Sequence, residues 1–300
     1  MDGGSVVLAD LPLPCLDGSV LMNADCYYAC GSSHNVCQDY AVVDAPEETA
    51  RAFVADGCGS SEDTDIGARL LCRLAQRYWS LNDINSSAMN IVCTARVTLD
   101  LLAVPDEALD STLLVANADK EFCTVRMFGD GVVVVRDREG LFKVFKVEYN
   151  GNAPLYLSYF ISEGRRAKYV EQGLGVMTVK EIRDGEVVNE SEIHFKNEET
   201  AKDNSWWAMI EARYHDLVLL FSDGVDSFTS VEQTETGRQK SSVSLTDVLD
   251  EFMKIKGTGG EFIKRRAKRF LRDAAKRGWQ HEDDFSVAGI WLDKPPVDEE

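Results

Sequence analysis

Several features that would place this 300-residue chain in other classes of protein are missing from its sequence. No apolar run approaches the roughly 18 to 20 residues of a transmembrane helix, so we expect no membrane association. The first residues, Met1-Asp2-Gly3-Gly4, are acidic rather than basic, which argues against a signal peptide. There is also no internal repeat and no low-complexity linker. We therefore expect a soluble, cytoplasmic protein.

Basic residues are scarce as well. The chain has 32 Lys and Arg against 51 Asp and Glu, for a net charge of −19. A surface of that sign repels a phosphate backbone, so we expect no nucleic-acid partner. With 44% hydrophobic residues, the chain can nevertheless bury a large core, as a globular enzyme does.

Cysteine pairs with the spacing of a metal site or a disulfide framework are absent too. The eight cysteines all lie at or before Cys123, and none of them forms a Cys-x-x-Cys pair. Disulfide frameworks and thiolate metal clusters both need closer or more regular spacing. We expect the cysteines to be mostly reduced, as in the cytosol.

What the sequence does contain is a set of four short acidic islands, most of them at the ends of apolar runs. Ala52–Ala55 leads into Asp56-Gly57, and Leu217–Phe221 leads into Ser222-Asp223-Gly224. The other two islands are Gln38-Asp39 and Asp283-Asp284, the latter just before Phe285–Ile290. Aspartates at strand ends can be gathered to one point, where their like charges repel unless a cation compensates. Hard oxygen ligands select magnesium or manganese, so the pattern predicts a carboxylate-rich two-metal site.

The rest of the pattern predicts an α+β protein with antiparallel sheets. Most apolar runs are short and follow one another, and helices stand apart in blocks. We expect helices from Thr64 onward, from the N-cap Ser244 to Ile255, and over Phe262–Arg277. The expected strands are Tyr40–Val43, Ala52–Ala55, Asn90–Val104, Leu113–Val115, Phe122–Phe128, Val132–Val135 and Leu141–Val147.

In order and spacing the islands resemble the metal-dependent protein phosphatases of type 2C. Each tripeptide is weak alone, because Asp-Gly is a common turn. Together they span residues 37 to 286, although residues 150–215 carry no recognisable motif. The matching segments are Cys37-Gln38-Asp39, Asp56-Gly57-Cys58-Gly59, Gly129-Asp130-Gly131, Ser222-Asp223-Gly224 and Asp283-Asp284.

The resemblance implies a fold and a ligand set. The fold is a four-layer α-β-β-α sandwich, here a single domain over residues 1–294 followed by a disordered acidic tail, residues 295–300. Asp56 would bridge two Mn²⁺ or Mg²⁺ ions, and the Gly57 carbonyl would complete one of them. Asp223 and Asp283 would hold the other ion, Asp39 would act through metal-bound waters, and Asp130 would help to bind a third, weaker ion.

The activity implied by the resemblance is hydrolysis of phosphoserine and phosphothreonine on proteins by a hydroxide that bridges two cations. The partners would be a phosphorylated protein and a cognate Ser/Thr kinase. The chain has no Cys-x5-Arg loop, which a cysteine-based phosphatase would need. Two alternatives stay open: a phosphatase-like regulatory module with little turnover, and a two-metal hydrolase of small phosphate esters.

Two positions depart from the family pattern. His34 stands where many members have an arginine that clamps the phosphate, so with Asp39 and Asp56 it is our third catalytic candidate. Cys58 stands where several members have a histidine that protonates the leaving oxygen; His281 is the nearest replacement in sequence, but a structural role suits both residues better.

Two further segments have open interpretations. The Phe262–Arg277 helix is strongly basic in an acidic chain, so it either contacts an acidic or phosphorylated partner or is a solvated helix face. Residues 150–215 lie where the family has a variable flap, so their aromatic residues either set substrate choice or pack in the core.

Overall fold

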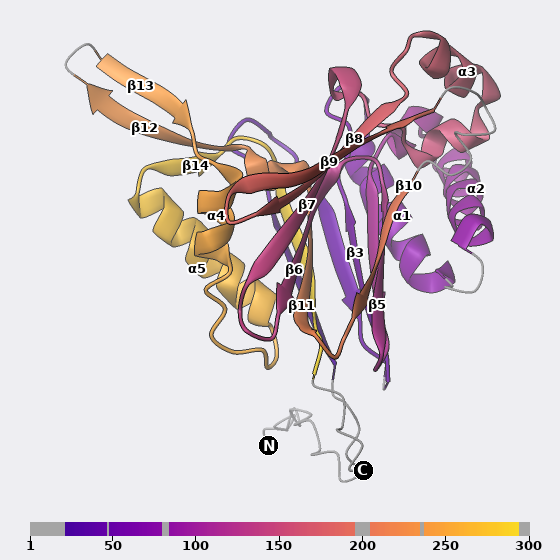
Figure 1. The fold of residues 1–300 in the computed structure, drawn as a ribbon. Helices are drawn as coiled ribbons and strands as arrows, with labels where there is room; N and C mark the ends of the chain where they lie inside the picture. Colours follow the sequence, from indigo (N-terminus) through magenta and orange to yellow (C-terminus); the bar gives the residue numbers. More distant parts are fainter. Residues whose placement is uncertain (1–21, 47, 80–83, 196–204, 235–236, 294–300) are drawn as a thin grey trace, which may run out of the picture.

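Two antiparallel sheets lie face to face in the computed structural model, and helices cover their outer faces (Figure 1). The structure describes residues 22–46, 48–79, 84–195, 205–234 and 237–293. This arrangement confirms the expected α+β class and its four α-β-β-α layers. The expected acidic tail, residues 295–300, lies outside the described residues.

The larger sheet carries two of the four acidic islands, Ser222-Asp223-Gly224 and Asp283-Asp284, and also the Gly129-Asp130-Gly131 segment. It has seven strands in the order β1-β15-β11-β6-β7-β8-β9, so the last described strand lies between the first and the eleventh. Its members are β1 (Asn23–Ala29), β6 (Gly131–Asp137), β7 (Phe142–Tyr149), β8 (Val176–Arg183), β9 (Glu186–His194), β11 (His215–Phe221) and β15 (Phe285–Trp291).

The second sheet has five strands in the order β10-β5-β4-β3-β2. These are β2 (Tyr40–Asp44), β3 (Ala50–Ala55), β4 (Leu113–Ala118), β5 (Phe122–Phe128) and β10 (Ser205–Glu211). A small outlying sheet of three strands contains β12 (Phe228–Thr234), β13 (Gly237–Ser242) and β14 (Trp279–His281).

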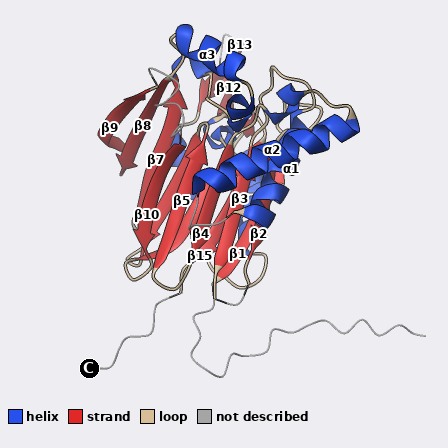
Figure 2. Cartoon of the chain, turned by 90° about the vertical axis from the view of Figure 1, so that its right-hand side faces the viewer, coloured by secondary structure: helices blue, strands red, loops and turns tan. Residues whose placement is uncertain are grey.

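Five α-helices and several short 3-10 turns are described. Figure 2 shows α1 and α2 in front of the five-stranded sheet, while α4 and α5 cover the other sheet in Figure 1. None of these helices is long and apolar enough to span a membrane within the described residues. The helices are α1 (Thr64–Tyr78), α2 (Ile84–Leu102), α3 (Glu163–Glu171), α4 (Leu245–Phe252) and α5 (Phe262–Lys276), with 3-10 turns at Asp106–Leu109, Asn150–Asn152, Leu157–Ile161 and Asp223–Asp226.

Alternation along the strands builds three apolar layers. In β3, Val54 faces the other sheet, whereas Phe53 faces α1 and α2. In β11, Leu220 faces the sheet interface, whereas Leu219 packs against α4 and α5. Because successive residues of a strand point to opposite faces, these continuous apolar runs belong to strands that are buried on both sides.

One predicted element is wrong. Residues 90–104 were expected to form a strand, but most of them belong to helix α2. The β-branched pairs in this stretch favour a strand locally. Its fully buried residues Ile91, Ala95 and Leu99 nevertheless recur every four positions, which is a helical spacing, and they pack on the five-stranded sheet.

The other expected helices and strands are present, with ends shifted by a few residues. The predicted N-cap is also confirmed, because Ser244 Oγ accepts a hydrogen bond from the Asp247 amide at 3.1 Å. Among the described residues seven cysteines are present and all of them are free.

Strand register gathers the acidic islands at one edge of the sandwich. Tyr40 pairs with Ala55, so Asp39 before β2 lies beside Asp56 after β3. Phe221 at the end of β11 pairs with Val132 of β6 and with Val287 of β15. This pairing brings the residues after β11 next to those that precede the other two strands.

Gly224 allows the loop after β11 to lie directly against the loop before β15. A Cβ atom added to Gly224 would lie only 1.6 Å from the Asp284 carbonyl oxygen. Any side chain at this position would therefore push apart the loops that carry Asp223 and Asp283.

We expect Gly224→Ala to destabilise the protein by roughly 2 to 4 kcal/mol, since the obstructing atom belongs to the backbone. Thermal unfolding measures the loss. The matched control is Gly164→Ala in α3, where an added Cβ would meet nothing within 4 Å. Equal melting temperatures for the two variants would contradict the close approach.

Candidate metal centre

Asp39, Asp56 and Asp223 form the middle of the site. The Asp56 carboxyl lies within hydrogen-bonding reach of both Asp39 and Asp223. Ser222 Oγ donates to Asp39 Oδ2 at 2.6 Å and accepts from the Ser286 amide at 3.1 Å. These contacts join residues from both sheets, so the site exists only when the sandwich is assembled.

These carboxyls are poorly compensated by the protein. Burial raises the pKa of Asp39 to about 7, although hydrogen bonds from Asp56 and Ser222 lower it. Burial also raises the pKa of Asp56 well above its ordinary value, and the charges of Asp39 and Asp223 raise it further. Such shifts are typical of like charges held together without a cation.

The donor set suits a divalent cation. Asp39 Oδ1 and Asp223 Oδ1 are buried without a hydrogen-bond donor, which leaves two oxygens free to bind an ion. Carboxylate oxygens are the ligands that Mg²⁺ and Mn²⁺ prefer. Within the described residues, however, no three His, Cys, Asp or Glu side chains already stand in a metal-ligating arrangement.

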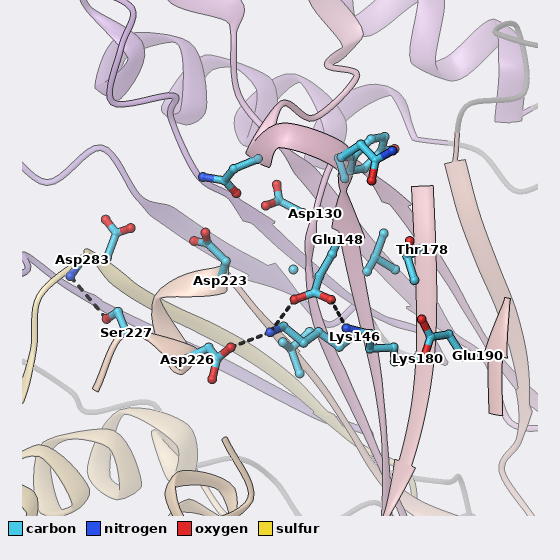
Figure 3. A pocket seen from close by; sticks show the side chains of 16 residues that line it. Asp130, Lys146, Glu148, Thr178, Lys180, Glu190, Asp223, Asp226, Ser227 and Asp283 are labelled. Atoms are coloured by element: carbon cyan, nitrogen blue, oxygen red, sulfur yellow. Dashed lines mark hydrogen bonds and ion pairs between the residues drawn. The ribbon is translucent and has the colours of Figure 1, made fainter. Parts of the chain in front are cut away.

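A cavity of about 580 Å³ opens beside these residues, and Figure 3 shows it from close by. Three of the predicted metal ligands line it: Asp130, Asp223 and Asp283. Burial raises the pKa of Asp130 to about 7, and the charge of Asp223 adds to the effect. For Asp283 the same two causes raise the pKa.

Other carboxylates of this cavity already have cations from the protein. Lys146 Nζ lies 2.5 Å from Asp226 Oδ2 and 2.7 Å from Glu148 Oε1. Lys180 Nζ lies 2.6 Å from Glu148 Oε2. Hydrogen bonds from the two lysines outweigh burial and lower the pKa of Glu148, so it stays ionised. Glu148 thus differs from the aspartates predicted to bind metal, which have no Lys or Arg partner among the described residues. These are Asp39, Asp56, Asp130, Asp223 and Asp283.

Asp284 is a buried carboxylate near the site for which the sequence pattern predicted no separate role. It is 2% exposed and accepts hydrogen bonds from the amides of Gly31 at 2.7 Å and Gln38 at 2.5 Å. Although burial raises the pKa of Asp284, these hydrogen bonds and His34 lower it overall. Asp284 thus fixes the loop before β2 to the loop before β15.

His34 lies beside the predicted ligands. Its Nδ1 is 3.2 Å from Asp284 Oδ2, and its Nε2 is 3.6 Å from Asp283 Oδ1. Burial lowers the pKa of His34, but the hydrogen bond and charge of Asp284, with Asp283 and Asp39, raise it overall. The histidine therefore lies close to these carboxylates, and they favour its protonated, charged form.

The Asp56-Gly57 turn is held by hydrogen bonds to two neighbouring segments. The Asp56 amide donates to Thr112 Oγ1 at 2.9 Å, and the Gly57 amide donates to the Gln38 carbonyl at 3.2 Å. Gly57 also lies against Thr64, where an added Cβ would come within 2.7 Å of the side chain. The predicted ligands Asp56 and Gly57 thus have little freedom to move.

Asp110 ties this loop to Ser158 and Arg165, which follow β7 in the chain. The Cys58 amide donates to its carbonyl at 2.8 Å, and Ser61 Oγ donates to its Oδ2 at 3.1 Å. From the other side Arg165 Nη2 donates to both carboxylate oxygens, at 2.9 and 2.7 Å, and Ser158 Oγ adds a bond of 2.6 Å. No motif or periodicity in the sequence predicts this hydrogen-bonded cluster, or hub, around the buried Asp110.

The contacts of the remaining candidates, Cys58, His281 and the aromatic residues of 150–215, are with neighbouring protein groups. Cys58 Sγ lies 3.1 Å from Ser60 Oγ. His281 packs against Phe228 with ring centroids 5.6 Å apart, and its Nδ1 lies 3.0 Å from the Asp283 carbonyl oxygen. In residues 150–215, Trp206 packs on Phe145 in the core, whereas Trp207 is 60% exposed.

Comparison with known proteins agrees with this architecture. The family model described as protein phosphatase 2C matches residues 28–272, so the chain belongs to the protein phosphatase 2C family. No curated protein sequence matches the chain significantly.

Solved structures show the same fold at low sequence identity. A bacterial serine phosphatase has a TM-score of 0.54 at 11% identity, covering 92% of this chain and 100% of its own. The serine/threonine phosphatase Stp1 from Staphylococcus aureus has a TM-score of 0.53 at 10% identity, covering 94% and 100%. A structure of the phosphatase domain and a fragment of the regulatory domain of SpoIIE from Bacillus subtilis has a TM-score of 0.50 at 14% identity, covering 92% of this chain and 65% of that one.

The raised pKa values predict that the metal-free protein loses stability as pH rises. Asp39 has a folded pKa of about 7 against an ordinary value of 3.8, so its contribution is present below pH 4 and is lost as the pH rises through 7. In excess chelator, we expect the melting temperature to fall by roughly 5 °C or more between pH 5 and pH 8. Added Mn²⁺ should restore more stability at pH 8 than at pH 5.

Net charge also changes over this range, so a control must remove one charge elsewhere. Asp39→Asn should flatten the pH dependence in chelator, whereas Asn at the exposed Asp184 should leave it unchanged. If the melting temperature falls equally with pH in Asp39→Asn and the wild type, Asp39 is not the group that stays protonated in the folded protein.

Proposed function

We propose that the protein hydrolyses phosphoserine and phosphothreonine on other proteins with two bound Mn²⁺ or Mg²⁺ ions. The observation that carries this proposal is the set of aspartates at one edge of the sandwich that lack a Lys or Arg partner among the described residues. Membership of the protein phosphatase 2C family supports the same chemistry. The substrate would be a phosphorylated protein, supplied by a Ser/Thr kinase.

The residues that would hold the two ions are Asp56, Asp223 and Asp283, with Asp39 behind them and the Gly57 carbonyl beside them. Asp130, which lines the same cavity, would help to hold a third, weaker ion. When bound, such cations act as a Lewis acid that lowers the pKa of water and offsets charge on phosphoryl oxygens.

Other residues of the chain would orient the side chains around the phosphate and favour protonation of His34. Ser222 keeps Asp39 in one orientation, and the Ser286 amide of β15 keeps Ser222 in place. Asp284 keeps His34 close to the cavity and favours its protonated form. A protonated His34 can donate a hydrogen bond to a phosphoryl oxygen, in place of the arginine of other family members.

The alternatives make different predictions for the same assay. A regulatory module would bind metal without turnover, and a hydrolase of small esters would prefer an aryl phosphate to a phosphopeptide. A phosphatase of the proposed kind should require metal for both substrates and prefer the phosphopeptide.

The first test is metal-dependent activity. We expect no hydrolysis in excess chelator, recovery with Mn²⁺ or Mg²⁺, and a loss on the order of a hundredfold or more in Asp56→Asn or Asp223→Asn. Asp184→Asn is the control, since its side chain is exposed and it follows β8 at the strand end away from Thr178, which lines the cavity. Full activity in chelator, or wild-type rates in either ligand variant, would show that the reaction occurs elsewhere.

The second test concerns His34. Above the raised pKa of His34 the imidazole loses its charge, whereas an arginine keeps a fixed charge and a bidentate fork. His34→Arg should therefore lower KM increasingly as pH rises, by about 1 to 2 kcal/mol of binding at the highest pH. The quantity to plot is the variant-to-wild-type ratio of kcat/KM, because metal chemistry also changes with pH. A flat ratio near one from pH 6 to pH 9 would remove His34 from the phosphate site.

A further inference from the structure

Helix α5 presents a face of positive charge that the proposed activity does not use. Five exposed residues of this helix recur at positions i, i+3, i+4, i+7 and i+11 and so share one side. We call them the basic patch: Arg265, Lys268, Arg269, Arg272 and Lys276. The opposite side of α5, including Ile263 and Phe270, is buried against the seven-stranded sheet.

The charges of the patch are poorly balanced by the chain. Arg272 and Lys276 share one carboxylate, that of Asp273, at 3.7 and 3.2 Å. Within the described residues Lys268 and Arg269 have no ion pair. Residues 254–277 hold ten Lys and Arg against two Asp and Glu, in a chain whose net charge is −19. Acidic residues are thus plentiful in this protein but nearly absent here.

This composition works against the helix itself. Lys268 faces Arg272, and Arg265 faces Arg269, at i,i+4 spacing, where like charges destabilise a helix. Early Lys and Arg residues also oppose the helix dipole. Local choices that disfavour the fold without a packing benefit are expected at functional sites.

A small hollow lies at one end of the patch. It has a volume of about 90 Å³, and its lining includes Lys254, Lys256, Arg265 and Arg269. Such a space accommodates one carboxylate or phosphate group, and no acidic side chain lines it. The nearby helix N-terminus already has its own anion, since Asp25 Oδ2 accepts from the Lys264 amide at 2.9 Å.

We propose that the basic patch docks an acidic segment of a partner protein, with one anionic side chain in the hollow. The charge complementarity is local, because screening limits it to about 10 Å at 0.1 M salt. A long nucleic acid would also meet the strongly acidic remainder of the surface. Insertion into a membrane would need an exposed apolar face, and that face of α5 is buried.

The test is direct binding, measured by fluorescence anisotropy of a short labelled Asp/Glu-rich peptide. We expect saturable binding that weakens with salt and falls about tenfold or more in Lys268→Glu/Arg269→Glu. Neither residue touches the candidate metal centre, so metal-dependent hydrolysis of an aryl phosphate should be unchanged. Because Lys268→Gln/Arg269→Gln removes like-charge repulsion, it should weaken binding while keeping or raising the melting temperature.

The matched control is Lys120→Glu/Arg213→Glu, which changes net charge equally at two exposed positions away from α5. An equal loss of binding in the control would mean that only net charge matters, and would overturn the proposal. So would failure of the wild type to bind the peptide, or tighter binding to vesicles of anionic lipid or to single-stranded DNA. The readout does not depend on hydrolysis, so this proposal and the proposed activity can fail separately.

Discussion

Repulsion among carboxylates at one edge of the sandwich is the constraint on which the site depends. Asp39, Asp56 and Asp223 come from three separate strand ends and have raised pKa values or unpaired oxygens. The fold holds them together by other means: antiparallel register, the close approach at Gly224, and Ser222, which bonds to Asp39 and to β15. The energy of the sandwich core maintains an arrangement that would otherwise spread apart, and a bound cation would relieve it.

Neighbouring carboxylates acquire different roles from their partners. Asp284 accepts two backbone amides and contacts His34, so it is a structural anion with a lowered pKa. Asp283, the residue before it, has a raised pKa and faces the cavity. Glu148, in the same cavity, is neutralised by lysines. The partner of a carboxylate, rather than its position in the motif, decides whether it can serve an external cation.

Local sequence was sufficient for the parts of the protein whose signals are local. Short consecutive apolar runs predicted the antiparallel α+β class, and aspartates at strand ends predicted the convergence of the acidic islands, whereas the four layers were implied by the family resemblance. Local sequence was insufficient in α2, where the spacing of apolar residues was ambiguous between helix and strand. It was also insufficient in β9, whose residues are all exposed and so show no apolar periodicity. It could not predict the hub at Asp110 either, because Arg165 lies 55 positions away and no periodicity connects them. The roles of the individual metal ligands remain predictions.

The place of β15 in the larger sheet has a consequence for biosynthesis. This strand is the last one described, yet it lies between β1 and β11 and hydrogen-bonds to both. Until it is released from the ribosome, β1 has no neighbour in its sheet and Ser222 lacks the amide that fixes it. A nascent chain can pair β2, β3, β4 and β5 and pack α1 and α2 on them earlier, since these elements are close in sequence. The acidic edge therefore assembles only after β15 has been synthesised, later than the strands that precede it in the chain.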